Sequence, residues 1–289
     1  MAETTRLEKV SPVAIIGGET DVGRSVLPAF LDAGIFGVAL FSCRETAAAY
    51  AQAVHQGRLK VVWGRMDNLM RLHSLLVIHE VTALFYFGTS EPNCLRTLHQ
   101  AVGRYTTDLP VIVCHRQADG QEALRRWQRM PLRLGIVQVE EIFGPGLVPS
   151  TQTPCPDPPI SVQQTELAPG LTNQPSLSAD EQTQHDYVYV ADLADALILM
   201  AQQVRQQKRS LCLPFRSGWR FTRQQWSSLH TMAAAGQWHV PEIHAIPSHP
   251  WGWRPRRTLE QALRETYTIG PTSRNHQDRT PGIGLRQAA

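Results

Sequence analysis

Short apolar runs alternate with amphipathic segments through the first half of the chain. The runs are rich in β-branched and aromatic residues, whereas the segments between them repeat apolar residues at the three- and four-residue spacing of helices. The runs predict strands at residues 13–16, 37–42, 59–63, 83–87, 111–114 and 135–139. The intervening segments predict helices at residues 22–31, 47–56, 68–78, 92–104 and 121–128.

This alternation of strand and helix determines the expected fold class. Strands that are apolar throughout, each followed by a helix, are typical of a parallel sheet covered on both faces. Right-handed crossovers then give a doubly wound sheet. We therefore predict an α/β protein with a Rossmann-like doubly wound parallel sheet and a small C-terminal lobe.

The composition divides the chain into four parts. Residues 1–149 are expected to form the Rossmann-like dinucleotide-binding core. Residues 150–184, rich in Pro, Gln, Ser and Thr, bury too little apolar surface to order themselves and predict a flexible loop. Residues 185–269 should supply a last core strand, a helix capped by Asp192 and a small substrate-type lobe. Residues 270–289 are expected to be a polar tail.

A glycine-rich turn joins the first strand to the first helix. Gly17, Gly18 and Gly23 are spaced so that backbone amides can approach a pyrophosphate, whose charge the helix N-terminus favours. Thr20 and Val22 complete the set of candidate cofactor contacts in this turn. The same pattern also fits a tight turn that binds no ligand.

Charged and bulky residues around this turn predict weak binding. Thr20 stands where a third glycine would ease the approach of the ligand, and Glu19 and Asp21 place carboxylates beside a diphosphate. Arg44, after the second strand, could meet the 2′-phosphate of NADP, or it could be a solvated surface arginine. If a dinucleotide binds, these residues favour NADP over NAD.

Five segments match, in order, the motifs of one family. They are residues 16–34 (the glycine turn and first helix), 63–67 (WGRMD, for G-D-x-x-D, with Arg65 replacing the acid), 142–146 (IFGPG, for V-Y-G-P-G), 185–196 (HDYVYVADLADA, for R-D-F-V-Y-V-D-D-V-A-D-A) and 252–263 (GWRP, then TLEQAL after two residues). Together they make the chain resemble the extended short-chain dehydrogenases/reductases, the NAD-dependent epimerase/dehydratase family, over residues 13–267.

The resemblance implies a cofactor and a chemistry. Members of this family act mostly on nucleotide sugars with a nicotinamide cofactor, and Asp67 would be a further cofactor contact. A tyrosine serves as general base or acid, and a lysine four residues later lowers its pKa. A free phenol with a pKa near ~10 is a poor base at neutral pH, so the ammonium group is needed.

The sequence departs from the family at this catalytic pair. Its lysines are Lys9, Lys60 and Lys208, and no tyrosine is followed by a lysine at the fourth position. The predicted helix at 121–128, where the pair is expected, has no tyrosine. The departure indicates a catalytically impaired or non-catalytic relative.

Cys114 ends the fifth predicted strand and His115 follows it directly, at the position of the family's hydroxyl residue. Consecutive strand residues point to opposite faces, so the two side chains cannot form a nucleophile–base pair in one pocket. We interpret Cys114 as a buried thiol. His115 is the one catalytic candidate, as a proton carrier near neutral pH.

The composition and net charge of the chain limit the classes of partner and the location to be expected. The 289 residues are 42 % hydrophobic and 18 % charged with a formal net charge of +3, which gives no reason to expect nucleic acid. No apolar run is long enough for a membrane span, and the polar start of the chain has no signal-peptide core, so a cytoplasmic protein is expected. The five cysteines have no C-x-x-C spacing and the histidines no H-E-x-x-H pair, so we expect no metal.

Three functional hypotheses remain open. The favoured one is a binding, regulatory or assembly protein that holds NAD or NADP weakly. The second is an atypical NADP-dependent oxidoreductase or epimerase with a non-standard proton donor. The third is an interaction protein that binds no dinucleotide. A nucleotide-type ligand and a protein partner or second copy are the partners that these hypotheses allow.

Overall fold

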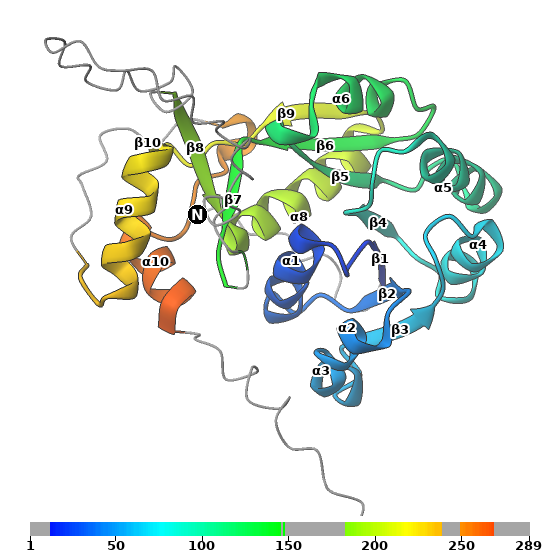
Figure 1. The fold of residues 1–289 in the computed structure, drawn as a ribbon. Coiled ribbons are helices and arrows are strands. Elements are labelled where there is room, and N and C mark those ends of the chain that lie inside the picture. Colours follow the sequence, from blue (N-terminus) through cyan, green and yellow to red (C-terminus); the bar gives the residue numbers. More distant parts are fainter. Residues whose placement is uncertain (1–11, 146, 148–182, 239–248, 269–289) are drawn as a thin grey trace, which may run out of the picture.

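The computed structural model describes residues 12–145, 147, 183–238 and 249–268 (Figure 1). The loop predicted at 150–184 falls almost entirely outside the described residues, as does the whole tail predicted at 270–289. Lys9, Gly146 and Cys155 also lie outside them.

A seven-stranded sheet with strand order β3-β2-β1-β4-β5-β6-β9 forms the centre of the fold. Every pairing within it is parallel, as expected for strands that are apolar throughout. The predicted doubly wound Rossmann-like sheet is therefore confirmed. Its strands are β1 (Val13–Ile16), β2 (Gly37–Phe41), β3 (Leu59–Trp63), β4 (Ala83–Tyr86), β5 (Val111–Arg116), β6 (Leu134–Val139) and β9 (Leu211–Pro214).

Helices cover both faces of this sheet (Figure 1). One apolar layer joins α1, α3 and α8 to the sheet, and the other joins α4, α5 and α6. The helix predicted at 47–56 is instead two short helices, separated where the buried Tyr50 packs on Phe41 with ring centroids 5.7 Å apart. The helices are α1 (Asp21–Asp32), α2 (Arg44–Ala48), α3 (Ala51–His55), α4 (Leu69–Ile78), α5 (Pro92–Tyr105), α6 (Gln121–Gln128) and α8 (Val190–Gln207), with a 3₁₀ turn at Gln117–Asp119 before α6.

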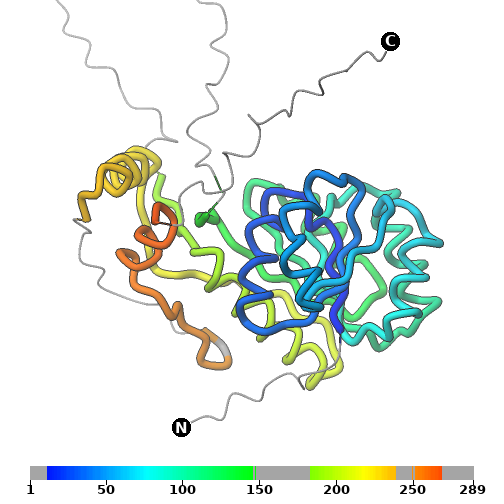
Figure 2. The backbone as a smooth tube through the Cα atoms, turned by 90° about the horizontal axis from the view of Figure 1, so that it is seen from below, coloured from blue at the N-terminus to red at the C-terminus, as the bar shows by residue number. Residues whose placement is uncertain are grey.

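A smaller lobe lies at one end of the molecule, where Figure 2 shows α9 (Arg223–Ala234) and α10 (Leu259–Thr268) outside the layers of the main sheet. Its sheet has the order β10-β8-β7. The strand expected to be the last of the core, β8, belongs to this sheet, whereas the main sheet ends with β9, which the sequence pattern did not reveal. The strands of the small sheet are β7 (Glu141–Phe143), β8 (Gln184–Tyr189) and β10 (Arg220–Thr222).

Aromatic rings fill the interior of this lobe. Trp226 of α9 stacks on Tyr187 of β8 with centroids 3.9 Å apart, and Phe143 of β7 meets the same indole edge-on at 4.8 Å. Each of these rings is almost completely buried. Offset and edge-to-face ring pairs stabilise a core beyond the area they bury, which explains why a short, Trp-rich segment packs as a lobe.

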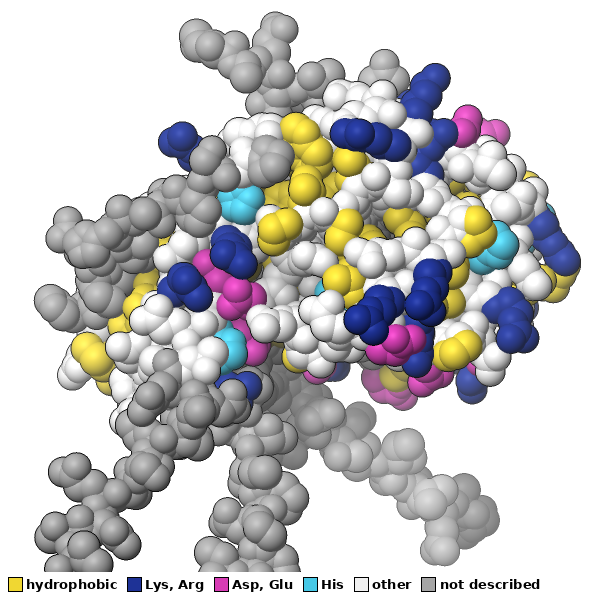
Figure 3. All heavy atoms as spheres, turned by 90° about the horizontal axis from the view of Figure 1, so that it is seen from above, with side chains coloured by type: hydrophobic (Ala, Val, Ile, Leu, Met, Phe, Trp, Pro, Cys, Tyr) yellow, Lys and Arg dark blue, Asp and Glu magenta, His cyan; other side chains and the backbone are white. Residues whose placement is uncertain are grey.

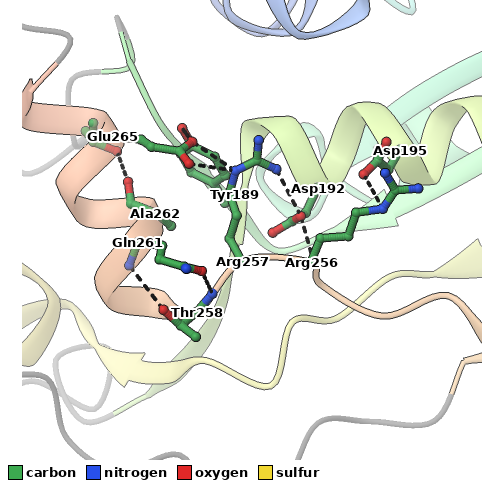
Figure 4. A network of polar contacts seen from close by, with 10 residues as sticks. Tyr189, Asp192, Asp195, Arg256, Arg257, Thr258, Gln261, Ala262 and Glu265 are labelled. Atoms are coloured by element: carbon green, nitrogen blue, oxygen red, sulfur yellow. Dashed lines mark hydrogen bonds and ion pairs between the residues drawn. The ribbon is translucent and has the colours of Figure 1, made fainter. Parts of the chain in front are cut away.

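Asp192 connects the lobe to the main domain (Figure 4). The prediction that it caps a helix is wrong, because α8 begins two residues earlier, at Val190. Its buried carboxylate instead accepts the backbone N–H of Arg256 at 3.0 Å and lies 3.5 Å from the guanidinium of Arg257. Arg257 also pairs with Glu265 of α10 at 2.9 Å, so one arginine joins the two helices.

Burial raises the pKa of Asp192 from 3.8 to about 6. A carboxyl whose pKa is higher folded than unfolded contributes stability below the unfolded value, and this contribution is lost as the pH rises through the folded value. A shift of about two pKa units corresponds to a change of at most about 3 kcal/mol in the free energy of unfolding over this pH range.

As the pH rises from 4 to 7, we expect the Asp192→Asn variant to lose less stability than the parent protein. Its amide can still accept the Arg256 N–H, and Arg257 keeps Glu265 as a partner. Thermal unfolding of both proteins across this pH range gives two profiles of stability against pH. Subtracting one profile from the other cancels the contribution of groups that both proteins share, such as Asp195. Parallel pH profiles would contradict the prediction.

Candidate functional site

The strand order reverses between β1 and β4, and ligands of open parallel sheets bind at the carboxyl ends of the strands near such a point. A cleft of about 460 Å³ opens there, which we call the main cleft. It is lined by residues 20–22 at the start of α1, 87–90 after β4, 114–116 at the end of β5, and by Asp119, Ala123 and Trp127.

The predicted glycine turn borders this cleft. Gly17 has a φ of +79°, and a Cβ there would come within 2.7 Å of the backbone of Phe87 and Gly88. A Cβ on Gly23 would come within 2.1 Å of the Gly17 carbonyl oxygen. The structure therefore requires both glycines for the close approach of the turn to α1 and to the loop after β4, whether or not a ligand binds.

Thr20 is the N-cap of α1. Its hydroxyl accepts the N–H of Gly23 at 3.1 Å and donates to the Gly17 carbonyl at 2.8 Å. The side chain predicted to crowd the ligand is thus bonded within the turn. A helix leaves its first amides without intrahelical acceptors, and with Gly23 capped, the amides of Asp21 and Val22 remain to meet an anion. The helical pattern after Thr20 is the sequence signal that could have predicted this cap.

The two carboxylates of the turn have different surroundings. Asp21 lines the main cleft and forms an ion pair with Arg24. Glu19 instead reaches the end of β2, where it accepts hydrogen bonds from the hydroxyl and the backbone N–H of Ser42. Of the two carboxylates, only that of Asp21 therefore lies where it would repel a phosphate bound at the N-terminus of α1.

The side chains expected at the adenosine end have partners of their own. Arg44 is the first residue of α2, and its guanidinium lies over the indole of Trp63, 5.8 Å from the ring centroid. Asp67 forms an ion pair with Arg65 at 2.9 Å, and this hydrogen bond lowers the pKa of Asp67. Trp63 is 45 % exposed at the end of β3, an open apolar surface that the sequence reasoning did not consider.

Cys114 and His115 point to opposite sides of the sheet, as the strand geometry predicts, although both residues contribute to the lining of the main cleft. Cys114 contacts the apolar layer of α1 and α8, and burial raises the pKa of its thiol to about 12. His115 is 4 % exposed, and its Nδ1 lies 3.9 Å from the carboxylate of Asp119. Burial lowers the pKa of His115 and so favours its neutral imidazole form, although the nearby Asp119 acts in the opposite direction.

Helix α6 presents Ala123 and Trp127 to the main cleft. These residues are four apart and share a helix face, the spacing at which the resemblance implies a tyrosine and a lysine. Trp127 is 3 % exposed and packs edge-on against Tyr86 with centroids 5.2 Å apart. Tyr86 donates its hydroxyl to the Thr89 carbonyl at 3.0 Å, and burial raises its pKa. No lysine lies on this helix, since Lys60 is on β3 and Lys208 ends α8.

A second cleft of about 240 Å³ lies on the other side of His115. It extends from the end of β6 to Phe215 and Arg216, beyond the end of β9. Arg216 lies 3.9 Å from the carboxylate of Glu140, so this cleft offers both charges to a polar ligand. His115 lines both clefts and is the one sequence-predicted catalytic candidate at their boundary.

The surface of the described residues has mixed charge. In Figure 3, basic and acidic side chains are interspersed on the face that is seen. Among the described residues, no three His, Cys, Asp or Glu side chains gather as a metal site would require. Within the same part of the chain, no helix is long and apolar enough to cross a membrane.

Solved structures with similar folds are numerous, and several of them are complexes with NAD or NADPH. The dTDP-glucose 4,6-dehydratase of Bacillus anthracis, in complex with NAD, is 13 % identical, with a TM-score of 0.65 over 90 % of this chain and 96 % of that chain. The chain has the fold of the extended short-chain dehydrogenases/reductases. The UDP-glucose 4-epimerase of Stenotrophomonas maltophila, with bound NAD, is 14 % identical (TM-score 0.58, 90 % and 97 % covered). Yeast methylglyoxal/isovaleraldehyde reductase, complexed with NADPH, is 13 % identical (TM-score 0.55, 89 % and 97 % covered).

Sequence comparison gives no further assignment. No family model matches the chain, and no curated protein matches it either. Because the similar structures share so little sequence with this chain, the likeness establishes the fold, and the site residues must carry any argument about function.

Proposed function

We propose that this chain is a nicotinamide-dinucleotide-binding relative of the nucleotide-sugar epimerases and dehydratases that has little or no catalytic activity. It would act as a binding, regulatory or assembly protein. The observation that carries the proposal is the face of α6, where Ala123 and Trp127 meet the main cleft in place of a proton-transferring pair.

The residues at the β1–β4 reversal fit a dinucleotide, and two features limit its affinity. The glycine turn and the amides of Asp21 and Val22 would hold a pyrophosphate, and the main cleft would take the nicotinamide end. A bound nicotinamide supplies a hydride donor or acceptor. The Thr20 cap occupies one amide, and the Asp21 carboxylate repels phosphate.

An atypical oxidoreductase is the second candidate, and His115 is the observation that favours it. A neutral imidazole at the boundary of two clefts can accept a proton from a bound alcohol, and Asp119 would stabilise the resulting imidazolium. The same burial that keeps the ring neutral also makes protonation costly.

An interaction protein without a cofactor is the third candidate. It is favoured by the side chains at the glycine turn and after β2 that already have partners within the protein: Thr20 with Gly23, Glu19 with Ser42 and Arg44 with Trp63. Met70, Val77 and Ile78 of α4 are apolar and exposed, which supports contact with a protein partner or a second copy of the chain. A cytoplasmic location remains part of the proposal.

Titration calorimetry with NAD and NADP tests the proposal. We expect dissociation constants above roughly 10 µM for both cofactors, because the cap and one carboxylate oppose the phosphates. In the Asp21→Asn variant both should bind about two to five times more tightly, a modest gain because the side chain is exposed and screened.

Asp32→Asn, at the far end of α1, is the control, since it removes the same charge away from the cleft. It should leave both affinities unchanged. Nanomolar binding by the parent protein would overturn the prediction of weak binding. Absence of heat at millimolar cofactor, with no dinucleotide in the purified protein, would favour the interaction protein instead.

A further inference from the structure

The Glu19 carboxylate joins the glycine turn to the end of β2. Its Oε1 accepts the Ser42 hydroxyl at 2.6 Å, and its Oε2 accepts the Ser42 backbone N–H at 3.0 Å. Ser42 is the first residue after β2. An acid therefore stands at the carboxyl end of the second strand, although residues 42–44 (SCR) contain none.

The carboxyl end of the second strand is where such sheets distinguish the two nicotinamide cofactors. An acid there accepts the ribose 2′-hydroxyl of NAD, whereas an arginine accommodates the 2′-phosphate of NADP. An ionised carboxylate only accepts hydrogen bonds, so it suits a hydroxyl and repels a phosphate.

Arg44, the residue that favours NADP in the sequence, contacts a side chain of the neighbouring strand β3. Its guanidinium lies over the exposed indole of Trp63 at the end of β3. A cation held over an aromatic face is attracted to the ring, and this attraction competes with a phosphate for Arg44. Glu19, by contrast, is held by two hydrogen bonds directly at the end of β2.

We propose that Glu19, supplied from the glycine turn, is the acid that binds the adenosine ribose and that it makes the site selective for NAD. The proposal rests on the proposed dinucleotide binding. It reverses the preference for NADP that Arg44 suggests in the sequence. The glycine turn would thus supply both the amides that bind the pyrophosphate and the carboxylate that binds the ribose. Ser42 holds this carboxylate in place by its two hydrogen bonds.

The Glu19→Gln variant tests this assignment through the ratio of NAD to NADP affinity, measured by calorimetry on the full chain. Glutamine keeps the length and can still bond Ser42, but it carries no charge. We expect the parent protein to bind NAD about tenfold more tightly than NADP, and the variant to lose most of this ratio, because a charge-assisted hydrogen bond and a repulsion both disappear. Circular dichroism should show an unchanged fold, since Glu19 is only partly buried.

Two variants serve as controls. Asp21→Asn should shift both affinities together, because the pyrophosphate it faces is common to both cofactors. Arg44→Ala should cause no selective loss of NADP. Tighter binding of NADP by the parent protein, equal affinities, or an unchanged ratio in Glu19→Gln would each overturn the assignment of Glu19 while leaving dinucleotide binding intact. If neither NAD nor NADP binds to the parent protein, to Glu19→Gln or to Asp21→Asn, the proposed function and this assignment are both overturned.

Discussion

Incubated with common nucleotide sugars and either nicotinamide cofactor, the protein is expected to give no epimerase, dehydratase or dehydrogenase product above the no-enzyme control. Positioned general acid–base catalysis is worth about 10² to 10⁴ in rate, and α6 offers no proton-transferring pair to the main cleft. The alanine and tryptophan that α6 presents there carry no titrating group. The nearby Tyr86 hydroxyl is bonded to a carbonyl, and burial raises its pKa, so it is a poor base.

The assay should follow the absorbance of the reduced cofactor and the product by mass. His115→Ala is the companion variant, because His115 is the one titrating side chain that lines both clefts and was predicted to transfer a proton. Turnover by the parent that disappears in this variant would establish the atypical oxidoreductase. Turnover that survives the substitution would place the chemistry on another residue, and the impaired-enzyme proposal would fail in either case.

Replacement of Trp127 by alanine is expected to destabilise the protein by about 3–5 kcal/mol, the usual cost of removing a buried large aromatic side chain. The indole is 3 % exposed, belongs to the apolar layer of α4, α5 and α6, and packs edge-on against Tyr86. This position of α6 therefore serves packing, which a lysine could not do without leaving a buried charge.

Urea unfolding followed by circular dichroism measures this loss of stability. Arg125→Ala is the matched control, because Arg125 is exposed on the same helix and should cost well under 1 kcal/mol. Trp127→Phe, which keeps an aromatic ring, should fall between the two. A loss below about 1 kcal/mol in Trp127→Ala would mean that the indole does not hold α6 on the sheet.

The sequence by itself determined the first six strands of the main sheet and most of the helices that follow them. Apolar runs of strand length alternate with helical periodicity, and both patterns are local, so each element can be recognised without its neighbours. The glycine turn, with φ of +79° at Gly17, is likewise recognisable from the glycines that lie close together in the chain. The absence of a Tyr-x-x-x-Lys pair is a property of the sequence alone.

Tertiary structure decided which side chains meet. Glu19 and Ser42 are 23 positions apart, and Asp192 and Arg256 are 64 apart, so no local pattern relates them. Sequence reasoning placed Glu19 beside a phosphate and Asp192 at a helix cap because each interpretation used only neighbouring residues. It assigned β8 to the core for the same reason, since an apolar strand does not show which sheet it joins. Hydrogen bonds and strand pairings between distant segments form only when the layers pack, and here they determine which groups remain free to meet a ligand.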